Sequence, residues 1–334
     1  MGTPEVLPEL RARRALASLG FRPDVTLKPV ESVNNEVWMT DDMVVRVSCR
    51  PEQRLRREAQ LSHALPAEVG YPQVLGYGGE MGCEWLVLGR IHGLPLSRCW
   101  PSMDPARRRR AIAQVADRMR RVHQTPAPPL APLRNLPQPI DPAPTGTMAV
   151  ARLLTALDRA GALEFVDRGI TQGLADLVGS LAWCLEPFTG RTLVHGDLSF
   201  ENILWDPDRD EVTALLDFEW SRGAPPDLDL DVLLRFCAYP DLHVPSAYAA
   251  MTLADDYSEV PHWLSEDYPE LFKSPHQLDR CRLYSIAWDV EELLNFPPVM
   301  ASSRLDARHP YRRLQSLLVG DSHLDRLHRS SITA

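Results

Sequence analysis

The stretch from Thr192 to Trp220 constrains this chain most, because it places acidic and amide side chains at fixed spacing around short apolar runs. The first run, Leu193-Val194, leads into Asp197, and Asn202 follows five residues later. The second run, Val212–Leu216, is followed by Asp217. The Asx and proline residues between the runs, at 206–210, are typical of a tight turn. We therefore expect two short hairpin strands, each with a carboxylate at one end.

These three polar residues also match a spacing template for phosphoryl transfer. In protein kinases a catalytic-loop Asp is followed five residues later by an Asn, and then by a metal-binding Asp that opens a D-F-x triplet. Asp197, Asn202 and Asp217 occupy these positions in order. Each residue alone would more often be a turn or cap residue, but the three together favour a kinase-type site. Their oxygens suit Mg²⁺, which one or two carboxylates usually hold together with substrate phosphates.

The same stretch resembles the aminoglycoside phosphotransferase and choline kinase-like superfamily. His195-Gly196-Asp197 stands where protein kinases have H-R-D, and Asp217-Phe218-Glu219 stands where they have D-F-G. The segment Gly223–Leu230 resembles that family's G-D-P-x-x-D-L-A element, with Asp229 on its second Asp. The resemblance implies that His195 and Asp229 support the catalytic loop.

The resemblance also implies a bilobal, protein-kinase-like fold of the α+β class. Residues 1–91 would form a small nucleotide-binding lobe with an antiparallel sheet and a helix. Residues 92–334 would form a larger, mainly helical lobe for catalysis and substrate binding. At 334 residues the chain can form two sizeable cores. Residue patterns predict strands at 25–30, 36–40, 44–48, 73–77 and 83–88, and helices at 8–19, 51–65, 104–124, 148–157, 163–185, 230–236 and 275–296.

In the first lobe, Arg46 is the lone charge within an apolar strand pattern. A charged side chain in a half-buried strand needs an anionic partner. The kinase template has a Lys here, which contacts the phosphates and pairs with a helix Glu. Arg keeps that charge and offers a bidentate fork. We expect Arg46 to pair with Glu58, although Glu58 could instead pair with Arg54 on the face of its own helix.

Two backbone elements complete the predicted nucleotide site. The family commonly has Gly-Gly-x-x-Asn in its first turn; Asn35 matches the end of that element, whereas Glu31 and Ser32 occupy the Gly positions. The run after the last predicted strand of the lobe resembles the family's hinge. There, backbone groups of Gly89 and Ile91 would bind adenine or guanine, so the sequence leaves the choice between ATP and GTP open.

The long helix predicted near the C-terminus ends in the acids Asp289, Glu291 and Glu292. This ending resembles the acidic helix end that lines the aminoglycoside pocket in the family, where carboxylates would bind ammonium groups. A set of surface charges is the alternative of equal weight. The net charge of −9 is compatible with a cationic substrate and argues against nucleic-acid binding.

Other features narrow the cellular and chemical context. The six cysteines are scattered without a C-x-x-C pair, which argues against a zinc knuckle or a disulfide framework. The N-terminal residues lack an apolar signal core, and no uncharged apolar run reaches about 18 residues. We expect a soluble, cytoplasmic protein with no membrane partner; the sequence does not indicate its oligomeric state.

Together these patterns predict a small-molecule kinase that uses Mg²⁺ with ATP or GTP. Asp197 would orient the acceptor hydroxyl and take its proton, while Asn202 and Asp217 would hold the metal. The acceptor would be an aminoglycoside-like or other cationic antibiotic; an amino alcohol, sugar or homoserine-like metabolite is the alternative, since one fold serves many substrates. A catalytically silent binding protein is supported only by the turn without glycine. A metal-dependent hydrolase would need further ligands that the sequence lacks.

Overall fold

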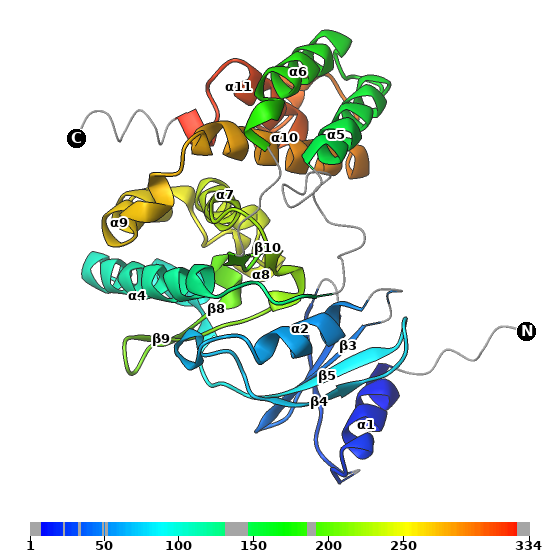
Figure 1. Cartoon of the computed structure of the whole chain (residues 1–334), viewed down its shortest axis with the longest axis vertical. Helices are drawn as coiled ribbons and strands as arrows, with labels where there is room; N and C mark the ends of the chain where they lie inside the picture. Colours follow the sequence, from blue (N-terminus) through cyan, green and yellow to red (C-terminus); the bar gives the residue numbers. More distant parts are fainter. Residues whose placement is uncertain are drawn as a thin grey trace, which may run out of the picture.

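The computed structural model describes residues 8–22, 24–32, 35–48, 50, 53–130, 146–185 and 192–325, with the backbone alone for 146–148. These residues form a small lobe built on an antiparallel sheet and a larger, mainly helical lobe (Figure 1). The predicted bilobal α+β class is therefore confirmed. Among the described helices, none is both long and apolar enough to cross a lipid bilayer.

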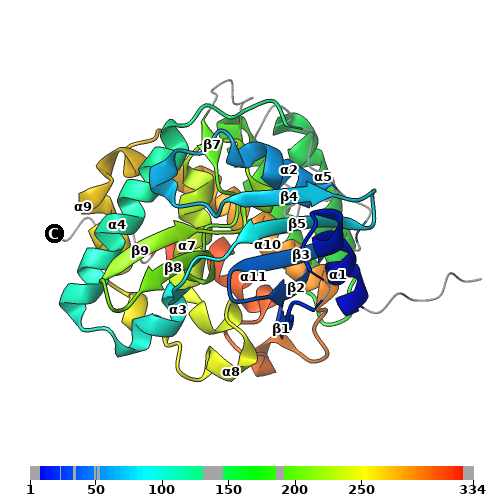
Figure 2. The ribbon, with the colours of Figure 1, turned by 90° about the horizontal axis from the view of Figure 1, so that it is seen from below.

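The N-terminal lobe contains a five-stranded sheet with a helix on each face (Figure 2). Its neighbouring strands are all antiparallel, in the order β1-β2-β3-β5-β4. The elements are α1 (Pro8–Ser18), β1 (Lys28–Val30), β2 (Glu36–Met39), β3 (Met43–Ser48), α2 (Arg54–Ser62), β4 (Val74–Gly78) and β5 (Glu84–Gly89).

Alternation along β5 decides which helix covers which face of this sheet. Val87 packs with α1, whereas its neighbours Leu86 and Leu88 pack with α2. Successive strand residues point to opposite faces, so the two helices lie on opposite sides of the sheet. As a result α2 lies between the sheet and the larger lobe, where it contacts the segment Phe218–Trp220.

The second lobe begins with two small sheets that flank residues 195–202, the segment that matches the kinase catalytic loop. A three-stranded sheet has the order β6-β8-β9, and β7 pairs with β10. The predicted turn over residues 206–210 is present, but it joins β8 to β9, so the apolar run at 193–194 is not the partner of β9. These elements are β6 (Leu94–Pro95), α3 (Leu96–Cys99), α4 (Pro105–Gln124), β7 (Leu193–Val194), β8 (Ile203–Asp206), β9 (Glu211–Leu215) and β10 (Arg222–Gly223).

Helices form the rest of the second lobe, with α5, α6, α10 and α11 grouped at the end remote from the N-terminal sheet (Figure 1). Sequence patterns leave α3, α8, α9 and α11 unassigned, because helices of one or two turns give too few positions for a helical period to be visible. The bounds are α5 (Gly146–Gly161), α6 (Arg168–Leu181), α7 (Asp227–Ala238), α8 (Ser246–Ala249), α9 (Val260–Asp267), α10 (Gln277–Asn295) and α11 (Pro310–Leu318).

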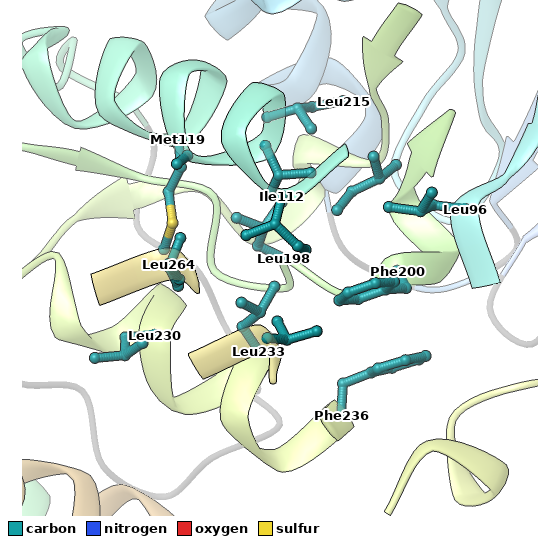
Figure 3. Close-up of a cluster of buried hydrophobic side chains, with 14 of the residues drawn as sticks. Leu96, Ile112, Met119, Leu198, Phe200, Leu215, Leu230, Leu233, Phe236 and Leu264 are labelled. Carbon is teal, nitrogen blue, oxygen red and sulfur yellow. The ribbon is translucent and has the colours of Figure 1, made fainter. Parts of the chain in front are cut away.

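One apolar core surrounds the buried side chains of the catalytic loop, residues 195–202 (Figure 3). Leu198 and Phe200 of the loop are buried in it beside Ile112 of α4 and Leu233 of α7. Phe200 also stacks on Phe236, with ring centroids 5.0 Å apart. Because alternate loop residues are buried in this way, the residues between them face the opposite side.

Candidate active site

The catalytic loop starts with a turn at Gly196 that strongly favours glycine. Gly196 has a φ of 83°, a left-handed conformation that residues with a Cβ seldom adopt. A Cβ at this position would lie 2.4 Å from the carbonyl oxygen of Trp220. The turn directs Asp197 and, further on, Ser199 into a pocket while Leu198 enters the core.

Asp229, in the first turn of α7, holds the loop from behind. Its Oδ2 accepts from the backbone N–H of His195 at 2.8 Å, and its Oδ1 accepts from that of Gly196 at 2.7 Å. His123 Nε2 lies 3.0 Å from Oδ2. Burial acts to raise the pKa of Asp229, but the hydrogen bonds that it accepts, including those from His123 and the Gly196 N–H, help to lower that pKa below its usual value. Asp229 therefore stays ionised and braces the loop, in the arrangement that the resemblance implied.

His195 orients the loop through both ring nitrogens. Nε2 lies 2.8 Å from the carbonyl oxygen of Leu216, and Nδ1 accepts from the backbone N–H of Asp197 at 3.3 Å. Burial lowers the pKa of His195, so its ring is neutral at pH 7. This arrangement assigns the ring proton to Nε2. The imidazole of His195 thus links the loop to Leu216, the residue directly after β9.

Pairing of β8 with β9 brings the second and third polar residues to the first. The N–H of Leu216 donates to the carbonyl oxygen of Asn202 at 2.8 Å, which places the next residue, Asp217, beside it. Asn202 Nδ2 donates to the carbonyl oxygen of Asp197 at 2.8 Å and to its Oδ2 at 3.2 Å. All three side chains line one pocket of about 530 Å³. The predicted convergence of these residues is therefore confirmed.

Asp217 has an unusual backbone conformation, and Asp197 has a raised pKa. Asp217 has a φ of 64°, a strained conformation that in non-glycine residues concentrates at functional sites. Desolvation, followed by the nearby Asp217 carboxylate, raises the pKa of Asp197 well above its usual value. A carboxylate with a raised pKa accepts a proton more readily, which suits a general base.

Arg46 connects the two lobes through three carboxylates. Nη1 bonds Glu58 Oε2 at 2.7 Å, and Nη2 bonds Asp217 Oδ1 at 2.8 Å and Glu219 Oε2 at 3.2 Å. The predicted Arg46–Glu58 pair is thus confirmed. Tyr71 Oη donates to Glu58 Oε1 at 2.8 Å. Burial nevertheless raises the pKa of Glu58 to about 7.

Glu219 and Tyr71 are site residues that sequence reasoning missed. Glu219 is 2% exposed and, besides Arg46, accepts from Asn35 Nδ2 at 3.2 Å and lies 3.6 Å from Arg54. The sequence feature that could have identified Glu219 is an acid in the third position of the D-F-x triplet, where protein kinases have glycine. Tyr71 had no signal, because its contact depends on how α2 packs.

The first-turn residues lie partly on the pocket wall. Glu31, Ser32 and Asn35 line the pocket, and residues 33 and 34 between them are outside the described residues. The predicted hinge lies away from this lining. There the N–H of Gly89 donates to the carbonyl oxygen of Gln73 at 2.8 Å. For Ile91, the described residues provide no partner to its backbone N–H.

The structure does not bring the α10 acids into the pocket. Asp289 is 2% exposed, and its Oδ1 bonds Arg235 at 2.7 Å and Arg313 at 2.8 Å. Glu292 accepts from Arg313 and from the Trp288 indole N–H, and Glu291 is not among the lining residues. These acids are outside the lining because the arginines of α7 and α11 hold Asp289 and Glu292.

The donor set near Asp217 fits Mg²⁺. Asp217 offers a carboxylate that is about one-third exposed, and the Nδ2 bonds of Asn202 leave its Oδ1 for other partners. Within the described ranges, no three His, Cys, Asp or Glu side chains gather closely enough to hold a metal ion. One carboxylate and one amide oxygen form the kind of partial site that Mg²⁺ completes with water and substrate phosphates.

The sequence model of the phosphotransferase enzyme family matches residues 26–264. No curated protein matches the chain.

Among the solved structures that share the fold, three show the range of similarity. One is a thermostable mutant of aminoglycoside phosphotransferase APH(4)-Ia in a ternary complex with AMP-PNP and hygromycin B, with 16% identity, a TM-score of 0.54, and coverage of 97% of this chain and 99% of its own. The streptomycin–ATP complex of APH(2")-IIa has 11% identity, a TM-score of 0.60 and the same two coverages, 97% and 99%. A choline/ethanolamine kinase family protein from Mesorhizobium loti has 17% identity, a TM-score of 0.57, and coverages of 96% and 99%.

Proposed function

The chain belongs to the phosphotransferase enzyme family, and from that premise we propose that it transfers the γ-phosphate of ATP or GTP to a hydroxyl of a cationic small molecule. Membership makes it a small-molecule kinase with an alcohol group as acceptor. The observation that carries the proposal is the convergence of Asp197, Asn202 and Asp217 on one pocket.

Each residue has a role that its contacts support. Asp197 would orient the acceptor hydroxyl and take its proton late, because a loose transition state makes little demand on a base. Arg46 would steady the α- and β-phosphates from its place between the lobes. Asn202 and Asp217 would hold Mg²⁺, which when bound neutralises phosphate charge. Positioning and charge neutralisation then account for most of the rate.

We place the nucleotide in the N-terminal lobe, residues 1–91, and the acceptor in the lobe formed by residues 92–334. The Gly89 carbonyl and the Ile91 N–H would bind the base at the hinge, while Asn35 steadies the turn that approaches the phosphates. The bound drugs of the fold neighbours, hygromycin B and streptomycin, make aminoglycosides the first acceptors to test.

The first prediction tests the catalytic role of Asp197. Asp197→Asn keeps the shape of the side chain but removes the proton acceptor, so we expect transfer to fall at least about 100-fold, in line with the loss of a general base. Affinity for Mg-ATP should change little. The measurement is release of the nucleoside diphosphate (ADP or GDP) with hygromycin B, streptomycin and choline as acceptors, alongside calorimetry for the nucleotide.

Asp255→Asn is the matched control, because Asp255 is an exposed acid outside the pocket lining. Full turnover by Asp197→Asn would refute the assignment. If the wild-type protein binds nucleotide but releases no ADP or GDP with any of these acceptors, that result would favour a silent binding protein.

A further inference from the structure

The pocket extends beyond the catalytic residues into a recess with mostly apolar walls. The recess lies between α7, the segment 242–245 and α10. Its apolar lining residues are Val232, Phe236, Leu242, Val244, Pro245 and Trp288. The charged and titratable groups that line this part are Asp231, Arg235 and His243. Apolar walls with a few fixed polar groups are typical of a site for a small organic molecule.

Asp231 is the polar group of this recess that lacks a full set of partners. It lies two positions after Asp229 on α7, about 200° around the helix, so it faces away from the catalytic loop. The side chain is 1% exposed. Its Oδ1 accepts from Ser285 Oγ at 3.1 Å, whereas its Oδ2 is buried without a hydrogen-bond partner among the described residues. A buried oxygen left unpaired in this way destabilises the fold.

The charge of Arg235 favours the ionised form of Asp231, but the arginines around it form their ion pairs with other acids. Arg235 lies one turn further along α7, but its Nη1 bonds Asp289, and its Nη2 donates to the Ser285 carbonyl oxygen at 3.3 Å. Arg313 in turn bonds Asp289 and Glu292. Two arginines are thus matched by two acids within this cluster. Asp231 remains as the additional negative charge at the pocket wall.

We propose, resting on the phosphotransferase function above, that Asp231 binds the protonated amine of an acceptor whose remaining surface is largely apolar. An ammonium group would give Oδ2 the charge-assisted hydrogen bond that it lacks. The apolar walls would cover the body of the molecule. The acceptor class is therefore an amine that carries a hydroxyl and an apolar body; Asp289 and Glu292 are not available to it, because arginines hold them.

The ionisation of Asp231 gives this subsite a pH signature. Burial raises the pKa of Asp231 to about 7. The groups that face it are Arg235 and Asp227 from α7 and Asp289, Ser285 and Cys281 from α10, while burial lowers the pKa of His243 to about 3, so that ring is neutral. An amine should therefore bind roughly ten times more tightly at pH 8 than at pH 6, as the ionised fraction of one carboxyl with this pKa rises.

The experiment compares a probe pair on the full-length protein without nucleotide. The probes are 2-phenylethylamine, which stays protonated across this range, and its neutral counterpart 2-phenylethanol. Ligand-observed NMR gives the dissociation constants at pH 6 and pH 8. We expect the amine to bind about tenfold more tightly than the alcohol at pH 8, with most of that preference lost at pH 6. Asp231→Asn should remove the preference at both pH values, and Asp255→Asn should keep it.

Two results would overturn the proposal. One is equal affinity of the wild-type protein for the amine and the alcohol at pH 8, including binding of neither at millimolar concentration. The other is an unchanged amine preference in a folded Asp231→Asn variant. The wild-type comparison stands even where the variant fails to fold. Because turnover is not measured, a failure of phosphate transfer would leave this outcome unaffected.

Discussion

At the scale of single residues, this protein buries carboxyl groups in places that disfavour their ionised form. Burial raises the pKa of both Asp231 and Glu58 to about 7. Glu58 is compensated by Arg46 and Tyr71, whereas one oxygen of Asp231 lacks a partner among the described side chains. Strain and poor solvation that persist inside a fold are typical of sites shaped by function.

These raised pKa values predict how stability changes with pH. A folded-state pKa above the unfolded value means that the folded protein binds the proton more tightly, so the unfolding free energy falls as pH rises toward 7. For Asp231 alone the loss between pH 5 and pH 8 should be about 2–3 kcal/mol. Asp231→Asn should therefore show a smaller decline than the wild-type protein in urea unfolding at these two pH values.

Glu58 contributes in the same direction, so some decline should persist in that variant. The wild-type decline is the reference for the comparison. An identical decline in both proteins would show that Asp231 ionises normally in the folded state, and would remove the expected pH signature of amine binding.

At the scale of elements, local signals were strong where a helix end is capped by its own sequence. Asp104 was predicted as part of the helix start, and its side chain accepts from the N–H of Arg107 at 2.8 Å, with Pro105 in the first turn. The buried face of α4 repeats at Ile112, Val115 and Met119, as the sequence spacing predicts. The buried face of this helix belongs to the core that also holds the apolar side chains of the catalytic loop (Figure 3).

The cap of α4 can be tested without touching the pocket. Asp104→Ala leaves an N–H of the first turn without its side-chain partner, so the unfolding free energy should fall by about 1 kcal/mol. Asp104→Asn is the matched control, because an Asn oxygen can make the same bond, and it should lose much less. Urea unfolding measures both. Equal losses in the two variants would mean that the charge matters at this position rather than the cap.

At the scale of the whole molecule, buried arginines of the small lobe join it to the large lobe, and Arg46 makes the most contacts among those described. Arg46 on β3 bonds Glu58 in its own lobe and Asp217 and Glu219 in the other. Glu219 also accepts from Asn35 in the first turn of the small lobe. A nucleotide bound between the lobes would therefore act on both of them through groups that already interact.

That arrangement predicts a metal-dependent thermal shift. Mg-ATP or Mg-GTP at about 100 times its dissociation constant should stabilise the wild-type protein by about 2.7 kcal/mol, and the unfolding midpoint should rise accordingly. Asp217→Asn removes the proposed carboxylate ligand, so the part of the shift that requires Mg²⁺ should disappear. Asp255→Asn should keep the full shift. A shift of unchanged size in Asp217→Asn would contradict the metal role.

The sequence by itself determined the catalytic spacing and most helices and strands, whereas the bilobal class was implied by the resemblance to a known family. The spacing depends on residues close together in the chain: Asn202 lies five residues after Asp197, and their contact is made within one loop. The Arg46–Glu58 pair was also within reach, because a strand and the following helix present both residues at template positions.

Only the tertiary structure decided which acids are available to a substrate. Asp289 and Glu292 resembled a cation site, but arginines from α7 and α11 hold them. Asp231 gave no signal, since its one-sided hydrogen bonding depends on α10 packing against α7. Whether a charge is neutralised depends on partners far away in the chain, and a local sequence pattern carries no record of those partners.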